Sequence, residues 1–200
     1  MRQSYSELSD SKTAALLKQM DQMNPDHGFN HKHTKMVERP LTFAPDWREL
    51  VVEDFSSIPF KSKTFIKGDS ILKPLVYSPD PYKDNAFDDL PLFLNHDTVA
   101  DYIDFYTQCL TIKTGKLKSV RSFDDIEWQD DLPPQARQAI EKDLLSYPQI
   151  TNDDDSLTVK MPCVFKQSIL IVTFLVHQDG TIDIMGRNSL IEDLPIRYFA

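Results

Sequence analysis

The stretch from Leu157 to Met185, LTVKMPCVFKQSILIVTFLVHQDGTIDIM, decides the fold of this chain. Its first part, 157–165, alternates apolar with mostly polar residues, which is typical of a strand with one face toward solvent. Ile169–Val176 is apolar at nearly every position, so we expect a strand covered on both faces. The turn signal Gln178–Gly180 separates it from a third alternating segment, 181–185. Together these segments predict a three-stranded antiparallel meander.

A middle strand that is apolar on both faces needs a cover on each side. Monomeric proteins rarely leave a large contiguous apolar face exposed to water. We expect helices to cover one face. The other face would then contact the N-terminal segment, further strands or a second copy of the chain, so dimerisation through the sheet is one hypothesis.

Three segments with helical spacing of apolar residues precede the meander. The strongest is 97–110, for which Asp97 is the expected N-cap. A second helix is predicted over roughly 6–22, with Ser4 and Glu7 as a capping box. A third begins at Pro133–Pro134 and ends before Pro148. The inner faces of the first and third helices are predicted to hold Val99, Tyr102, Ile103, Tyr106, Cys109 and Leu110, and Ala136, Ile140, Leu144 and Tyr147.

The remaining segments are interrupted by prolines and charged residues. We expect residues 24–62 to be irregular, wrapped on the surface, with a short helix within Trp47–Phe55. Residues 64–72 resemble a hairpin, and Pro74 would place its second strand at a sheet edge. Leu117–Phe123 is a weaker strand, and the acidic run Asn152–Ser156 is predicted to be a loop.

The pattern as a whole predicts an α+β fold. About three helices would pack on one face of a mainly antiparallel sheet, with the C-terminal meander at its centre. A helix that precedes a meander also occurs in cystatin-like rolls, including the nuclear-transport-factor-like group, and this is an analogy of topology only. We expect a single domain over 1–200, with 1–62 as a peripheral N-terminal helix and wrapping segment.

Composition narrows the classes of function. The 200 residues are 40% hydrophobic, which is enough for a core, and the net charge is −9. Such a charge disfavours nucleic acid and anionic membranes as partners. Cys109 and Cys163 lie within apolar patterns, which indicates buried reduced thiols, and no apolar leader or membrane-spanning run is visible. We therefore expect a cytoplasmic protein.

The first candidate site is a cluster of histidines near the N-terminus. His27, His31 and His33, with Asp26 beside them, place three imidazoles and a carboxylate within a short stretch. No cysteine pair or His-Glu-x-x-His pattern accompanies them. A polar surface loop explains them more simply than a metal site.

The second candidate is the aromatic group Tyr102, Phe105 and Tyr106 on the strongest helix. These side chains would line a ligand cavity between the helix and the sheet. The simpler interpretation is that they form part of the core, where the tyrosine hydroxyls would need hydrogen-bond partners.

Two charged clusters follow that helix. Lys113, Lys116, Lys118 and Arg121 form a basic patch, which either complements the negative C-terminal end of the helix or binds an acidic partner or phosphate. Asp124, Asp125 and Glu127 next to Trp128 have the composition of a carbohydrate cleft, but also of an ordinary acidic surface.

Catalytic and nucleotide-binding motifs are not visible. The five glycines are mostly isolated, and no Gly-x-Ser-x-Gly element occurs. The sequence therefore favours a non-catalytic interaction or regulatory domain, without a cofactor, whose partner is another protein or a second copy of itself. The alternative is a small-molecule-binding module or small enzyme with an apolar pocket beside the 97–110 helix. Metal-dependent hydrolysis at the histidines is a third hypothesis.

Overall fold

The computed structural model describes residues 4–24, 28–85, 87–112, 115–153 and 155–197. The chain forms two compact units, Met1–Leu75 and Val76–Ala200. Each unit has its own sheet, and all strand pairs within the two sheets are antiparallel. Helices accompany both sheets, so the predicted α+β class is confirmed.

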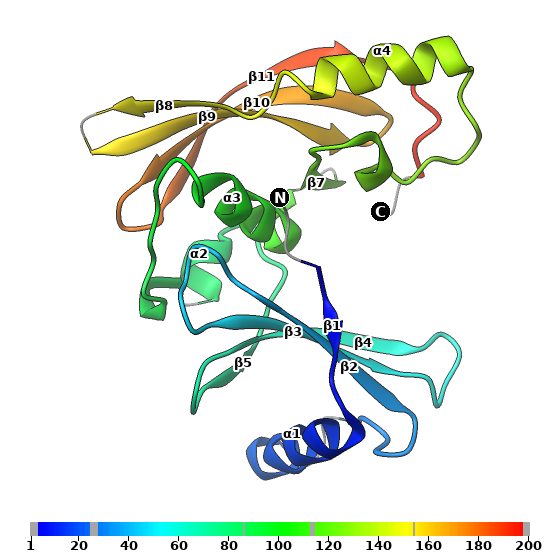
Figure 1. Ribbon diagram of the computed structural model, residues 1–200, viewed down its shortest axis with the longest axis vertical. Coiled ribbons are helices and arrows are strands. Elements are labelled where there is room, and N and C mark those ends of the chain that lie inside the picture. The colour runs from blue at the N-terminus through cyan, green and yellow to red at the C-terminus, as the bar shows by residue number, and fades with distance from the viewer. Residues whose placement is uncertain (1–3, 25–27, 86, 113–114, 154, 198–200) are drawn as a thin grey trace. The chain divides into compact units, whose positions relative to one another are not determined.

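The first unit is a meander that one helix covers. Its sheet runs in the order β1-β2-β3-β4-β5, and α1 packs against it (Figure 1). These elements are β1 (Ser6–Glu7), α1 (Asp10–Met23), β2 (Thr34–Pro40), β3 (Arg48–Asp54), β4 (Lys61–Lys67) and β5 (Leu72–Pro74).

The helical spacing of α1 produces its buried face. Leu16, Leu17 and Met20 recur every three or four residues and share a core with residues of β2 and β3. Met36 on β2 and Leu50 on β3 belong to that core and are almost fully buried. Burial of each such side chain contributes about 1.5–3 kcal/mol. The members of this core are Leu8, Leu16, Leu17, Met20, Phe29, Met36, Leu50, Val52, Phe65 and Leu72.

Several expectations for this unit were wrong. Residues 24–62 are not irregular, because β2 and β3 pair continuously from Thr34↔Asp54 to Pro40↔Arg48. The short helix predicted within Trp47–Phe55 is β3, where Leu50 and Val52 alternate toward the core. The Ser4–Glu7 capping box is also wrong, since Ser6–Glu7 pairs with β2 and Ser9 is the N-cap of α1.

Other expectations for this unit are confirmed. The hairpin predicted over 64–72 is formed by β4 and β5, which pair from Phe65↔Pro74 to Lys67↔Leu72. Pro74 lies on the edge strand β5, as expected for a residue that cannot donate a backbone hydrogen bond.

The second unit contains the stretch Leu157–Met185. Its sheet has the order β11-β10-β9-β7-β6, and β8 pairs with the N-terminal half of β9. The predicted C-terminal meander β9-β10-β11 is confirmed. The elements are α2 (Pro81–Asp84), a 3₁₀ turn (Phe87–Asp89), α3 (Val99–Cys109), β6 (Thr111–Ile112), β7 (Gly115–Ser119), a second 3₁₀ turn (Phe123–Asp125), α4 (Pro134–Leu144), β8 (Gln149–Asp153), β9 (Ser156–Phe165), β10 (Ser168–His177) and β11 (Ile182–Ile191).

Helices cover both faces of the central strand β10, not one face as expected (Figure 1). On the first face, Ser119 pairs with Cys163 in the sheet and bonds to Thr107 on α3. Ile169 has the opposite orientation and shares a core with Ile140 and other residues of α4. At Ile169, the second face of the apolar run Ile169–Val176 is therefore covered by α4 of the same chain.

The ends of several predicted elements differ in the structure. Thr98, not Asp97, is the N-cap of α3, and the Asn95 side chain accepts hydrogen bonds from the backbone N–H groups of both. Of the acidic run predicted to be a loop at 152–156, Asn152 and Asp153 belong to β8 and Ser156 begins β9, and Asp154 lies outside the described residues. Ala136, expected on the inner face of α4, is exposed.

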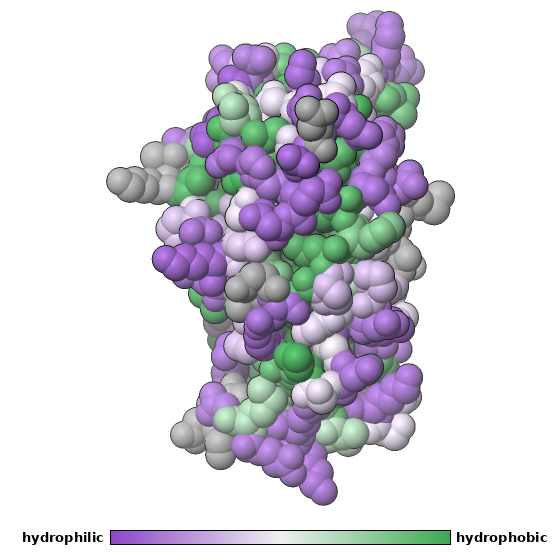
Figure 2. Space-filling view, turned by 90° about the vertical axis from the view of Figure 1, so that its left-hand side faces the viewer, coloured by the Kyte–Doolittle hydropathy of each residue, from purple (hydrophilic) through white to green (hydrophobic). Residues whose placement is uncertain are grey.

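The surface of the described chain is mixed in character. Figure 2 shows hydrophobic residues gathered in patches between hydrophilic ones on the face that it presents. No helix within the described residues is long and apolar enough to cross a membrane.

Candidate functional site

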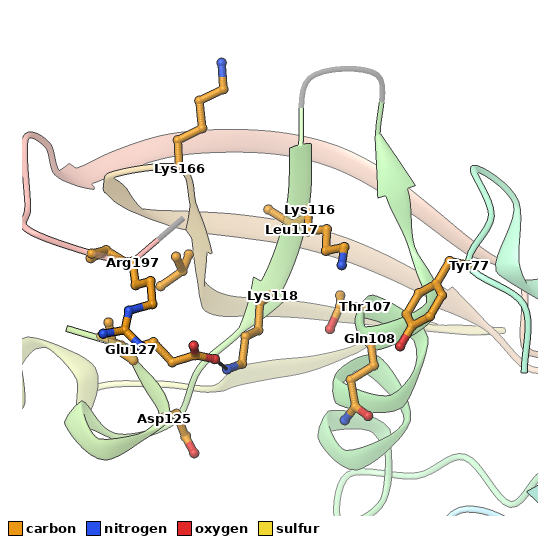
Figure 3. Close-up of a pocket in the computed structure, with 13 residues that line it drawn as sticks. Tyr77, Thr107, Gln108, Lys116, Leu117, Lys118, Asp125, Glu127, Lys166 and Arg197 are labelled. Atoms are coloured by element: carbon orange, nitrogen blue, oxygen red, sulfur yellow. Dashed lines mark hydrogen bonds and ion pairs between the residues drawn. The ribbon is translucent and has the colours of Figure 1, made fainter. Parts of the chain in front are cut away.

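A pocket of about 290 Å³ lies beside β7 in the second unit (Figure 3). We call it the β7 pocket. Buried apolar side chains form its floor, and charged side chains from separate segments surround them. The lining residues are Leu117, Ile126, Val164 and Ile196 (apolar), Lys116, Lys118, Lys166 and Arg197 (cationic), Asp125 and Glu127 (anionic), and Tyr77, Thr107 and Gln108.

The β-sheet register brings the charged residues together. Lys116 and Lys118 lie two residues apart on β7 and extend from one face of the sheet, where Lys118 pairs with Val164 of β9. Lys166 follows β9 in the turn before β10 and lines the pocket from there. Arg197 reaches the pocket because its backbone N–H donates to the carbonyl of Glu127 at 2.7 Å. Four cationic and two anionic side chains give this pocket a formal charge of +2, whereas the whole chain carries −9.

Both acidic residues of the pocket already have partners. The Asp125 carboxylate accepts hydrogen bonds from the backbone N–H groups of Arg121 at 2.8 Å and Ser122 at 3.0 Å. Glu127 accepts from the Lys118 amine at 3.3 Å (Figure 3). Their negative charge is thus partly compensated within the pocket, and a positive potential remains.

Tyr77 forms one wall of the pocket. The Lys116 amine lies 5.3 Å from the centre of the Tyr77 ring, a cation–π arrangement that holds the ammonium at the pocket rim. Two backbone hydrogen bonds hold the residue next to Tyr77. The Ser78 N–H donates to the Cys109 carbonyl at 2.9 Å, and the Ser78 carbonyl accepts from the Thr111 N–H at 2.8 Å.

A buried polar network attaches β7 to α3 behind the pocket. The Ser119 hydroxyl donates to the Asp104 carboxylate, and the Thr107 hydroxyl lies 3.0 Å from that of Ser119. Arg121 forms ion pairs with Asp101 at 2.6 Å and with Asp104 at 2.5 Å. Because hydrogen bonds and ion pairs satisfy the buried Asp104 carboxylate, the network holds β7 in a defined position.

The predicted basic patch is therefore divided by the fold. Lys116 and Lys118 line the β7 pocket, whereas Arg121 belongs to the buried network. Lys113 lies outside the described residues. Sequence reasoning missed Tyr77, Lys166 and Arg197, which are distant in the chain and carry no local signal of their own.

The three aromatic residues predicted to line a cavity take two different positions. Tyr102 and Phe105 are buried in the packing of α3, where the Tyr102 hydroxyl donates to the Gly180 carbonyl at 2.5 Å and Phe105 packs on Phe87. Tyr106 lines a separate hollow of about 590 Å³. Burial raises the pKa of Tyr102, and it raises that of Tyr106 to about 12. The other residues lining this hollow are Pro79, Asp80, Tyr82, Lys83, Thr181 and Ile182.

The histidine cluster does not assemble a metal site among the described residues. His31 lies 3.1 Å from the carboxylate of Asp21 on α1, and both side chains are about half exposed. His33 is exposed, and His27 lies outside the described residues. Within the described part of the chain, no group of three His, Cys, Asp or Glu side chains is placed to hold a metal ion.

Cys109 and Cys163 are both buried and are not joined in a disulfide, as expected. Cys163 lies under α3, and burial raises the pKa of its thiol. The thiol therefore remains protonated and unreactive at neutral pH.

The acidic cluster near Trp128 is also divided. Asp125 and Glu127 line the β7 pocket, whereas Trp128 lines another hollow of about 340 Å³. We call this second hollow the aromatic hollow. In it the rings of Phe123 and Trp128 stack with centres 4.6 Å apart. The remaining lining residues are Asp130, Asp131, Leu132, Pro134 and Arg137.

Comparison with known proteins adds no relative. No protein-family model, no curated protein and no solved structure matches this chain.

Proposed function

We propose that this chain is a non-catalytic, cytoplasmic interaction domain whose β7 pocket binds an acidic segment of a partner protein. The observation behind the proposal is the charge reversal at this pocket, which is positive on a chain of strongly negative net charge. Charge complementarity of this kind steers a partner and sets its orientation.

The composition of the pocket matches a segment that alternates carboxylates with an apolar side chain. Lys116, Lys166 and Arg197 offer charged donors at the rim, and Val164 and Ile126 offer apolar contact at the floor. The volume of about 290 Å³ lies just below the range for small-molecule pockets, about 300–1,000 Å³. That size suits one or two side chains better than a large cofactor.

The second candidate function is that of a small-molecule-binding module or small enzyme. The hollow lined by Tyr106, Asp80, Lys83 and Thr181 favours it, because apolar and polar groups converge there next to α3. Binding of a dye or metabolite to the wild-type chain, lost in Tyr106→Trp because the larger side chain fills the hollow, would support this second function.

Nucleic acid is not proposed as a partner. The net charge of −9 repels a phosphate backbone, and the lysines of the β7 pocket form a compact group and not an extended basic stripe.

The test of the leading proposal is a calorimetric titration with two matched peptides. One peptide has a central leucine flanked by glutamates, and the other has lysines in place of the glutamates. We expect only the glutamate peptide to bind, with an affinity that falls as salt is added. Lys116→Gln with Arg197→Gln should weaken it about ten-fold, since each charged contact contributes about 0.5–1 kcal/mol.

The matched control is Lys142→Gln, an exposed lysine on α4 outside the pocket. It should leave the affinity unchanged. Equal binding of both peptides, or a loss of affinity in Lys142→Gln as large as in the pocket variant, would contradict the proposal.

A further inference from the structure

The loop that joins β3 to β4 exposes three large apolar side chains. We call residues 55–60 the hairpin tip (Figure 1). Ile58 is 102% exposed, Phe55 50% and Phe60 51%, so the tip leaves most of its apolar surface in water. The rings of Phe55 and Phe60 stack with centres 5.4 Å apart, which makes the tip a single apolar projection. Apolar surface concentrated in this way marks a binding element.

Basic residues follow the tip directly. Lys61 and Lys63 are exposed at the start of β4, and the Lys61 amine donates to the Gly28 carbonyl at 2.9 Å. Asp54, the acidic residue just before the tip, is fully buried, and its carboxylate accepts hydrogen bonds from Asn30 and Ser56. Glu53 is half-exposed beside them, so the two lysines leave this surface with a net positive charge. A matching partner has an apolar hollow with an acidic rim.

The aromatic hollow of the second unit has those two properties. The stacked rings of Phe123 and Trp128, with Leu132 and Pro134, supply its apolar surface. Asp130 and Asp131 line it and are exposed. Arg137, its single cationic residue, is already paired with Glu141 at 2.8 Å, and its guanidinium lies over the Phe123 ring.

We propose that the hairpin tip of one copy of this chain docks into the aromatic hollow of a second copy. The apolar projection meets aromatic rings, and Lys61 and Lys63 meet Asp130 and Asp131. The two surfaces are different patches of one chain, so the contact is heterologous, and it either closes into a ring or extends as a chain of molecules. This inference uses no residue of the β7 pocket and does not depend on the proposed function.

The affinity of this contact should be modest. Three side chains and their surroundings bury less than the roughly 1,200 Å² of a small stable interface. We therefore expect self-association in the range of tens to hundreds of micromolar, and the experiment must include such concentrations.

Charge exchange between the two surfaces gives the sharpest test. Sedimentation of the wild-type chain should show a mass that rises with concentration. Lys61→Glu with Lys63→Glu, and separately Asp130→Lys with Asp131→Lys, should each weaken association about ten-fold or more. An equimolar mixture of the two variants should associate again, because each supplies the surface that the other has lost. A chain that combines all four substitutions should also associate.

Two further variants separate the apolar contribution from general effects. Ile58→Ser with Phe60→Ser should reduce self-association to the level of the charge variants, whereas Phe93→Ser, an exposed aromatic residue outside both surfaces, should not. A wild-type chain that stays monomeric at several hundred micromolar overturns the proposal. So does a mixture of charge variants that fails to associate. Tip-dependent binding to phosphatidylserine vesicles by a monomeric wild-type chain would assign the tip to a lipid surface instead.

Discussion

The hydroxyl of Ser119 on β7 donates a hydrogen bond to the carboxylate of Asp104 on α3, at a distance of 2.5 Å. This bond joins the helix that covers the first face of the sheet to the strand that carries Lys116 and Lys118. Arg121 completes the connection through its ion pair with Asp104. The position of the β7 pocket therefore depends on a buried polar network as well as on apolar packing.

Removal of the arginine from that network should destabilise the second unit. Arg121→Met leaves the buried Asp104 carboxylate without its cation, and loss of one partner of a buried pair costs about 3 kcal/mol or more. We expect the free energy of unfolding, measured with urea, to fall by about that amount. Arg197→Met at an exposed position is the control and should change it little. Equal stability of Arg121→Met and the wild type would show that the network is not needed.

The turn between β10 and β11 should tolerate only glycine at position 180. Gly180 has φ +91°, and a Cβ there would lie 2.2 Å from Leu92 Cδ1 and 3.1 Å from the Tyr102 hydroxyl. The Leu92 side chain can turn aside, so the main cost is the left-handed backbone, and Gly180→Ala should lose about 1–3 kcal/mol. The melting temperature and urea midpoint should both fall.

Gly186→Ala is the matched control for that substitution. A Cβ at Gly186 meets nothing within 4 Å, and the residue lies inside β11. Alanine in a strand interior is favoured over glycine by about 0.5–1 kcal/mol, so stability should be unchanged or slightly raised. If both alanine variants lost equal stability, the left-handed backbone at Gly180 would not be the cause.

The C-terminal meander could be predicted from the sequence because its physical signal is local. Apolar residues alternate along β9, and the glycine turn before β11 limits the possible pairings. The strand β3 lacked such a signal because two of its buried residues, one on each face, are acidic. Glu49 is 1% exposed and pairs with Arg39 at 2.5 Å, and Asp54 is 0% exposed. Their burial depends on partners in other segments, which a pattern of hydrophobic residues does not reveal.

The candidate site likewise combines residues that a local sequence signal reveals with residues that only the fold brings together. Lys116 and Lys118 are close in sequence, so their shared position was visible as a basic patch. Lys166 joins them only because the turn that follows Phe165 on β9 lies beside β7, and Arg197 only through its backbone contact with Glu127. Both depend on tertiary pairing.

Asp54 should make the stability of the first unit depend on acidic pH. Hydrogen bonds from Ser56 and Asn30, with the charge of Lys61, hold the pKa of this carboxyl below its usual value. A lowered pKa contributes stability above the unfolded-state pKa of about 3.9, and that contribution is lost as the pH falls through the folded-state pKa. Asp54→Asn should therefore be less stable than the wild type at pH 7, and the difference should narrow toward pH 3.

Urea unfolding at several pH values measures this difference, with Glu53→Gln as the control. Glu53 is the neighbouring, half-exposed acid on β3. A stability difference between Asp54→Asn and the wild type that stays constant from pH 7 to pH 3 would exclude the proposed cause.

Tyr106 should make the stability of the second unit fall as the pH rises into the alkaline range. Burial first, and then the charges of Asp80 and Asp183, raise its pKa from 10.0 to about 12. The neutral phenol is thus favoured in the folded state. Its contribution is complete below pH 10 and is lost as the pH rises through about 12, so the wild type should lose up to about 2–3 kcal/mol over that interval from this group.

Tyr106→Phe should lose less stability than the wild type between pH 9 and pH 11.5. Tyr77→Phe, at a residue that is 63% exposed, is the matched control. If Tyr106→Phe and the wild type instead lose stability in parallel over that range, the Tyr106 phenol ionises freely in the folded chain and the hollow beside α3 is open to water.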